Sequence, residues 1–227
     1  GGCGIIFCVA ALAGNARWLV ASDSMTKILY IHGLNSSPAS SKAQQLLRAM
    51  GQMGLADYLY LPALHHHPRQ AIQQLDAIIN GAGADQLVLV GSSLGGYYAT
   101  FLAQRHDLKA LLINPSVLPH QRLADHQALQ TNHYTGETWL VTDDHRHALA
   151  ELDVPAPQDP LRFQVWLQTG DETLDYRQAE QHYRACALRI EAGGDHSFQG
   201  FSAHLPALFA FVGLPPERWR DIDFSTL

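Results

Sequence analysis

From residue 26 onward, short apolar runs alternate with stretches in which apolar residues recur at helical spacing. The runs are bounded by glycine, proline or asparagine, as strands usually are. They predict strands at 28–31, 58–61, 87–90, 110–113, 138–141, 163–167 and 188–191. Alternating strands and helices indicate an α/β fold with a mostly parallel sheet and helices on both faces.

The stretches outside these runs place apolar side chains on one helical face. Pro68 precedes one of them, and a proline suits the first turn of a helix. We interpret the aromatic positions in these stripes as core. The stripes are Ala43, Leu46, Leu47 and Met50; Ala71, Ile72, Leu75, Ile78 and Ile79; Tyr97, Tyr98, Phe101 and Leu102; Tyr176, Ala179 and Tyr183; and Leu205, Leu208, Phe209 and Val212.

The segment from about 114 to 160 interrupts the alternation and is rich in histidine, proline, aspartate and glutamine. It is long for a simple connection. We therefore predict a small lid insertion within one catalytic domain, 25–214, followed by a surface-packed tail, 215–227. Residues 1–24 are predicted to be an extension outside this domain. The alternative is that 17–22 adds an edge strand.

Composition fits one globular domain, because the 227 residues are 47% hydrophobic and 16% charged. The net charge of −6 argues against a nucleic-acid or anionic-membrane partner. We expect a small-molecule substrate. The composition does not indicate an oligomeric state.

The cysteines, Cys3, Cys8 and Cys186, have no regular spacing, so they predict neither a disulfide framework nor a zinc site. Cys186 is interpreted as a small packed residue near a helix end. The apolar run near the N-terminus is too short for a membrane span, and no basic residue precedes it. With Met25 as a natural start, these features favour a cytoplasmic protein.

Two adjacent serines, Ser92 and Ser93, follow the run 87–90 in "LVLVGSSLGGYY". Only Ser93 has one glycine two residues before it and another two residues after it, which is the G-x-S-x-G pattern of a nucleophile elbow. A Cβ at either glycine would crowd this sharp strand-to-helix turn. We predict Ser93 as the nucleophile and Ser92 as a supporting residue of the turn. The alternative is that either serine only caps the helix.

Two later apolar runs also end in glycine turns. Asp171 follows the run 163–167, and His196 follows the run 188–191. The order Ser93, Asp171, His196 is that of an α/β-hydrolase triad. In such a triad the histidine takes the serine proton, and the aspartate orients the imidazole.

Other carboxylates compete for the role of the triad acid. Asp175 is the main alternative to Asp171, although it could cap the following helix. Asp143 and Asp144 follow the run 138–141 and are a further alternative. Asp195 is interpreted as a turn residue, since neighbouring side chains usually diverge.

A His-Gly turn follows the first apolar run. Such a turn supplies a backbone N–H to the reacting carbonyl oxygen, together with the N–H that follows the nucleophile. Leu34 and Leu94 are therefore the predicted oxyanion-hole donors. Residues of the turn that we predict near the substrate are His32, Gly33, Asn35 and Ser36. His32 itself is interpreted as a residue that bonds the loop backbone.

Several motifs together resemble the YqiA-like esterases, a family of small bacterial α/β-hydrolases. They are "LYIHGLNSSPASSKA", "LVGSSLGGYYAT", "NPSVLP", "YTGE", "QTGDETLDYRQA" and "GGDHSFQGF". The resemblance covers about 26–213. It implies carboxylesterase activity on short acyl esters, with acyl-CoA thioesters as a further substrate class. It implies no metal and no organic cofactor, and it carries the triad onto Ser93, Asp171 and His196.

One departure from that family is the run of His65, His66 and His67. Consecutive side chains do not converge on one ion, so we predict a solvated loop and no metal site. The sequence favours a serine esterase. An amidase or peptidase of the same fold and a catalytically silent binding protein remain the alternatives.

Overall fold

The computed structural model describes residues 25–83, 86–123 and 129–227. The predicted extension, 1–24, lies outside these residues, as does the alternative edge strand at 17–22. Within them the main sheet is parallel and has the strand order β2-β1-β3-β4-β7-β8. The strands are β1 (Lys27–Ile31), β2 (Leu59–Tyr60), β3 (Leu87–Ser92), β4 (Lys109–Ile113), β7 (Phe163–Gln168) and β8 (Ala187–Glu191). The predicted α/β-hydrolase fold class is confirmed.

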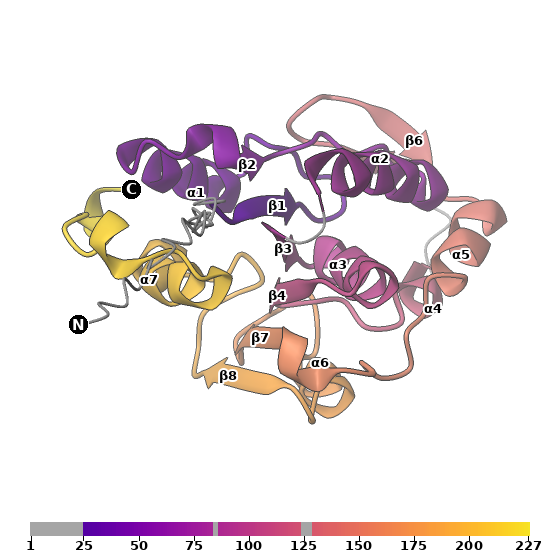
Figure 1. Cartoon of the computed structure of the whole chain (residues 1–227). Coiled ribbons are helices and arrows are strands. Elements are labelled where there is room, and N and C mark those ends of the chain that lie inside the picture. Colours follow the sequence, from indigo (N-terminus) through magenta and orange to yellow (C-terminus); the bar gives the residue numbers. More distant parts are fainter. Residues whose placement is uncertain (1–24, 84–85, 124–128) are drawn as a thin grey trace, which may run out of the picture.

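Helices cover both faces of this sheet (Figure 1). On one face lie α1 (Ser41–Gln52) and α7 (Phe201–Val212). On the other lie α2 (Pro68–Ala82), α3 (Leu94–His106) and α6 (Tyr176–His182). The predicted helical stripes all fall within or at the ends of these helices.

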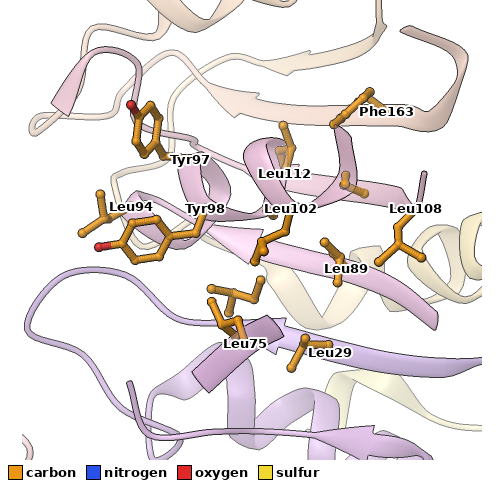
Figure 2. Packing of buried hydrophobic residues seen from close by; sticks show 14 of the residues in the cluster. Leu29, Leu75, Leu89, Leu94, Tyr97, Tyr98, Leu102, Leu108, Leu112 and Phe163 are labelled. Atoms are coloured by element: carbon orange, nitrogen blue, oxygen red, sulfur yellow. The ribbon is translucent and has the colours of Figure 1, made fainter. Parts of the chain in front are cut away.

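Successive residues of β1 point to opposite faces of the sheet. Ile28 and Tyr30 belong to the hydrophobic cluster beneath α1 and α7, whereas Leu29 and Ile31 belong to the cluster beneath α2 and α3. Figure 2 shows the second cluster, with Leu75 of α2 close to Leu29. Because both faces of the central strands are buried, β3 and β4 read as nearly continuous apolar runs instead of alternating ones, whereas the edge strand β8 is largely exposed.

The strands end at one common edge of the sheet. Ile31 pairs with Gly91, Ser92 pairs with Ile113, and Gln168 pairs with Glu191. The loops that follow β1, β3, β4, β7 and β8 therefore emerge side by side. The chain also reverses its direction across the sheet between β1 and β3, which is where open α/β sheets bind ligands.

The segment that we predicted as a lid contains several elements. They are α4 (Pro119–Arg122), β5 (Leu129–Thr131), β6 (Thr138–Leu140) and α5 (Asp143–Ala150). The predicted strand at 138–141 is present as β6, but it pairs antiparallel with β5 in a hairpin that is separate from the parallel sheet. The helix α5 was not predicted, since its sequence is polar and has no apolar stripe.

The C-terminal segment packs along α7. Trp219, Ile222 and Phe224 contact the cluster beneath α1 and α7, and the Trp219 indole Nε1–H donates to the Leu214 carbonyl at 3.2 Å. Cys186 follows α6 as a half-buried free thiol, and burial raises its pKa to about 11. Among the described residues, no helix combines the length and the apolar character that a bilayer span needs.

Substitution of Gly95 tests how closely α3 approaches β1. A Cβ built at this glycine would overlap the Ile31 carbonyl oxygen and lie 2.6 Å from the His32 carbonyl oxygen. Backbone atoms cannot rotate away, so Gly95→Ala is expected to lower the free energy of unfolding by about 3 kcal/mol or more. Urea unfolding measures this change.

Gly51→Ala is the matched control, because a Cβ built on this α1 glycine meets nothing within 4 Å. It should raise the unfolding free energy by about 0.5–1 kcal/mol, the usual gain when alanine replaces a helical glycine. Equal stability of the two variants would contradict the close approach of α3 to β1.

Candidate active site

Ser93 occupies the turn between β3 and α3 in a strained backbone conformation, with φ 56° and ψ −121°. Two hydrogen bonds hold this turn, from the Ser93 N–H to the Ile113 carbonyl and from the Ser116 N–H to the Ser93 carbonyl, each 3.0 Å. A Cβ on Gly91 would overlap the Gly95 carbonyl. The glycines on either side of Ser93 are therefore required by the turn, as the motif predicted.

Ser93, His196 and Asp171 form one chain of hydrogen bonds. The Ser93 hydroxyl lies 3.0 Å from His196 Nε2. On the other side of the ring, His196 Nδ1 lies 2.8 Å and 3.0 Å from the two carboxylate oxygens of Asp171. A carboxylate only accepts, so Nδ1 carries the proton and Nε2 is free to accept from the serine. This arrangement can deprotonate the hydroxyl.

The Asp171 carboxylate is buried but well supplied with donors. Burial, the largest influence, raises its pKa, but hydrogen bonds from His196 and from the Leu174 and Thr173 N–H groups together outweigh it. The pKa of Asp171 consequently lies below its usual value. The charge that orients the imidazole is therefore present at neutral pH.

The competing carboxylates all have other partners. Asp175 caps α6 by accepting from the Arg177 N–H at 3.1 Å and also binds its guanidinium. In α5, Asp144 accepts from His67 and Arg69, and Asp143 accepts from the Arg146 guanidinium. Asp195 accepts from the Gln199 side chain at 2.8 Å. None of these side chains is hydrogen-bonded to His196.

Two buried amides that sequence reasoning missed support the loop that carries His196. Gln168 Oε1 accepts from the N–H groups of Asp195 and Gln199 at 3.2 Å and 2.8 Å. Asn114 donates to the Asp195 carbonyl at 3.0 Å and accepts from the Gln168 N–H at 3.0 Å. Both follow or end apolar strand runs, and a polar residue in that position is the signal that could have identified them.

The His32-Gly33 turn lies directly against the nucleophile. A Cβ on Gly33 would lie 3.1 Å from the Ser93 Cβ and 3.6 Å from its Oγ, so a side chain there would occupy the space beside the hydroxyl. His32 bonds the loop: its Nε2 accepts from the Leu64 N–H at 3.1 Å, and its Nδ1 faces the Gly33 carbonyl at 2.9 Å. Burial, partly offset by that carbonyl, lowers the pKa of His32.

The two predicted oxyanion donors flank Ser93. Leu94 is the first residue of α3, and the first N–H groups of a helix have no acceptor within the helix. Leu34 follows Gly33 and lines the same cavity as Ser93. Two backbone N–H groups from these elements could stabilise negative charge on a reacting carbonyl oxygen.

Asn35 was predicted near the substrate, but its side chain is engaged with the β5–β6 hairpin. Its Nδ2 donates to the Gln130 side chain at 2.8 Å, and its Oδ1 accepts from the Trp139 indole at 3.0 Å. A third bond joins the Asn132 side chain to the Ser36 carbonyl at 3.0 Å. The hairpin is thus fastened to the turn that follows β1.

The prediction of a solvated histidine loop at 65–67 is wrong. His66 stacks on Trp139, with ring centroids 4.8 Å apart, and its Nδ1 lies 3.1 Å from Nε2 of His145 in α5. Burial and neighbouring histidines lower the pKa of His145 to about 4. Within the ranges that the structure describes, no three His, Cys, Asp or Glu side chains gather closely enough to hold a metal ion. The loop instead packs against the predicted lid.

A cavity of about 330 Å³ opens beside the nucleophile, and its lining includes Ser92, Ser93, His196, Gly33 and Leu34. This volume lies near the lower end of the range of small-ligand pockets, about 300–1,000 Å³. A much smaller cavity of about 30 Å³ shares Gly33 and Leu34 with it. The site therefore suits a small substrate.

Comparisons with known proteins agree with this fold. The model of a family described as "Uncharacterised protein family (UPF0227)" matches residues 27–213. A UPF0227 protein of Pectobacterium atrosepticum is 25% identical over 197 residues, which cover 82% of this chain and 99% of that relative.

Two solved structures illustrate the likeness in fold. The α/β hydrolase domain-containing protein 10 from mouse has a TM-score of 0.62 at 13% identity, over 81% of this chain and 88% of that one. Est1E from Butyrivibrio proteoclasticus, with bound ferulic acid, has a TM-score of 0.60 at 14% identity, over 82% and 86% of the two chains. At such identities the likeness extends to the fold alone.

Proposed function

Since this chain belongs to the uncharacterised protein family UPF0227, we propose its function from its own site: a serine carboxylesterase that hydrolyses short-chain acyl esters. The observation that carries this proposal is the hydrogen-bonded chain from Ser93 through His196 to Asp171 on a strained elbow. The small cavity beside Ser93 supports a short acyl chain. Acyl-CoA thioesters are the second substrate class to compare.

The proposed reaction has two halves. The Ser93 hydroxyl attacks the ester carbonyl carbon while His196 Nε2 takes its proton, and the carbonyl oxygen becomes an oxyanion held by the Leu34 and Leu94 N–H groups. The C–O bond to the alcohol then breaks, and His196 returns the proton to the departing oxygen. A water molecule, deprotonated by His196, then attacks the acyl carbonyl carbon. The bond to the Ser93 oxygen breaks and His196 returns the proton to that oxygen, which releases the acid and free Ser93.

Covalent labelling tests this proposal directly. A fluorophosphonate should lose fluoride and form one phosphonyl adduct on Ser93, located by mass spectrometry of the digested protein. Pre-incubation with the probe should abolish hydrolysis of 4-nitrophenyl butyrate. The Ser93→Ala protein should take up no label at the same probe concentration.

The possible results separate the alternatives. Absence of labelling on Ser93 together with absence of hydrolysis would support a catalytically silent binding protein. Labelling with faster turnover of the matched butyryl 4-nitroanilide than of the ester would support an amidase. A thioesterase would prefer butyryl-CoA to the ester.

A further inference from the structure

Lys42 is a lysine in the cavity beside the nucleophile. It belongs to the first turn of α1, and its ammonium donates to the carbonyl of Ser197 at 2.7 Å. Ser197 directly follows His196, so the ammonium lies beside the loop of the triad histidine. Lysine has three N–H donors. The Ser197 carbonyl occupies one, which leaves two for a ligand or water.

The charge of Lys42 has no direct partner within the part of the chain that the structure describes. Its ammonium forms no ion pair there, and no described carboxylate side chain lines the cavity. Burial lowers the pKa of Lys42 to about 8, against the opposing charges of Asp195 and Asp171. The group is still mostly protonated at neutral pH. A half-buried cation that has no direct ion pair gains stability when a ligand supplies one.

The cavity that contains Lys42 is lined by polar side chains as well as by the aromatic residues Tyr30, Phe198 and Phe201. Hydroxyl residues Ser36, Ser40 and Ser41 line the cavity together with Gln45. A cavity for a purely aliphatic acyl chain is expected to be mainly apolar. Several hydroxyls and one ammonium in the same cavity instead suit a ligand with a carboxylate or phosphate group, since charge-assisted hydrogen bonds are the strong ones.

We propose that Lys42 is a specificity-determining residue that binds an anionic group of the substrate, so that the preferred substrates are small esters bearing a carboxylate or phosphate. This inference rests on the proposed esterase function. The anionic group can belong to the acyl part or to the alcohol part of the ester. The ammonium and hydroxyls of the cavity lining would hold it within the same cavity as the reacting carbonyl.

The test compares esters that differ mainly in charge. For an anion on the acyl part, 4-nitrophenyl hemisuccinate is compared with 4-nitrophenyl butyrate. For an anion on the alcohol part, the butyryl ester of 3-hydroxybenzoate is compared with phenyl butyrate. In each pair the measured quantity is the ratio of kcat/KM for the charged ester to kcat/KM for the neutral one.

Lys42→Met keeps an unbranched side chain of similar length but removes the charge. In at least one pair the ratio should fall about 10- to 100-fold, the loss of one charge-assisted hydrogen bond. Lys42→Arg should restore much of the ratio. Lys27→Met is the matched control, because Lys27 also donates to a backbone carbonyl, that of Ala82, at the opposite end of β1. In Lys27→Met the ratio of kcat/KM for the charged ester to kcat/KM for the neutral ester should equal that of the unmodified protein.

The inference would be overturned if Lys42→Met left the kcat/KM ratio unchanged in both pairs, even if kcat/KM for the charged and the neutral ester fell together. That result would assign Lys42 to holding the Ser197 loop. Failure of the esterase function has a different signature, since hydrolysis of both esters would then survive Ser93→Ala or be absent throughout.

A binding measurement keeps the test independent of catalysis. Monomethyl succinate should bind to Ser93→Ala, measured by calorimetry, about 10-fold or more tightly than to Ser93→Ala/Lys42→Met. Methyl butyrate should show no such difference. Equal affinity of monomethyl succinate for the two proteins would contradict an anion site at Lys42.

Discussion

Ser93→Ala is expected to lower kcat for 4-nitrophenyl butyrate by about 10⁴- to 10⁶-fold. The serine hydroxyl is the only group at the elbow within hydrogen-bond distance of His196 Nε2 among the described residues, at 3.0 Å. Its removal leaves attack by water, assisted only by binding and the oxyanion donors. Steady-state kinetics on purified protein measure the change.

The fold should survive this substitution. Alanine retains the Cβ, so the backbone at φ 56° is no more strained than before. The two backbone hydrogen bonds of the turn, to Ile113 and from Ser116, involve no side chain of Ser93. The urea midpoint should therefore shift little, and loss of activity cannot be attributed to unfolding.

Ser92→Ala is the matched control. Ser92 is the last residue of β3 and is buried, and it has no hydrogen bond to His196. Its replacement should change kcat/KM less than about ten-fold. If Ser92→Ala lost more activity than Ser93→Ala, Ser92 would have to be assigned as the nucleophile. The prediction of Ser93 from the two flanking glycines would then be wrong.

Most of the main sheet could be predicted because its two faces are both buried. A central strand such as β3 or β4 is then a nearly uninterrupted apolar run that ends at a glycine or is followed by a polar residue. The strand at 138–141 looked the same in sequence but belongs to a hairpin. Its pairing depends on the turn formed by 132–137, and the apolar run alone carries no information about its partner.

The sequence could predict that Ser93, Asp171 and His196 lie close together because each follows a strand, and parallel strands end at one edge. The contacts that hold them could not be predicted. Gln168 and Asn114 form side-chain hydrogen bonds to the loop that follows β8. Contacts between residues so far apart in the chain produce no periodic pattern in the amino-acid sequence. The histidine run at 65–67 was misread because its partners, Trp139 and His145, lie in the insertion.

Asp171→Asn is expected to lower kcat by about 10⁴-fold with little change in the folded structure. The asparagine Oδ1 can still accept from the N–H groups of Thr173 and Leu174, now 2.9 Å and 2.7 Å from Asp171 Oδ1. Its amide NH₂ would then face His196 Nδ1. Since an NH₂ group donates, the ring would place its proton on Nε2 and could no longer accept from Ser93.

Asp175→Asn tests the rival carboxylate under matched conditions. Asp175 accepts from the Arg177 N–H as the N-cap of α6, and asparagine caps a helix about as well. Activity should therefore remain within about two-fold of that of the unmodified protein. If Asp175→Asn lost activity while Asp171→Asn kept it, the triad acid would have to be reassigned.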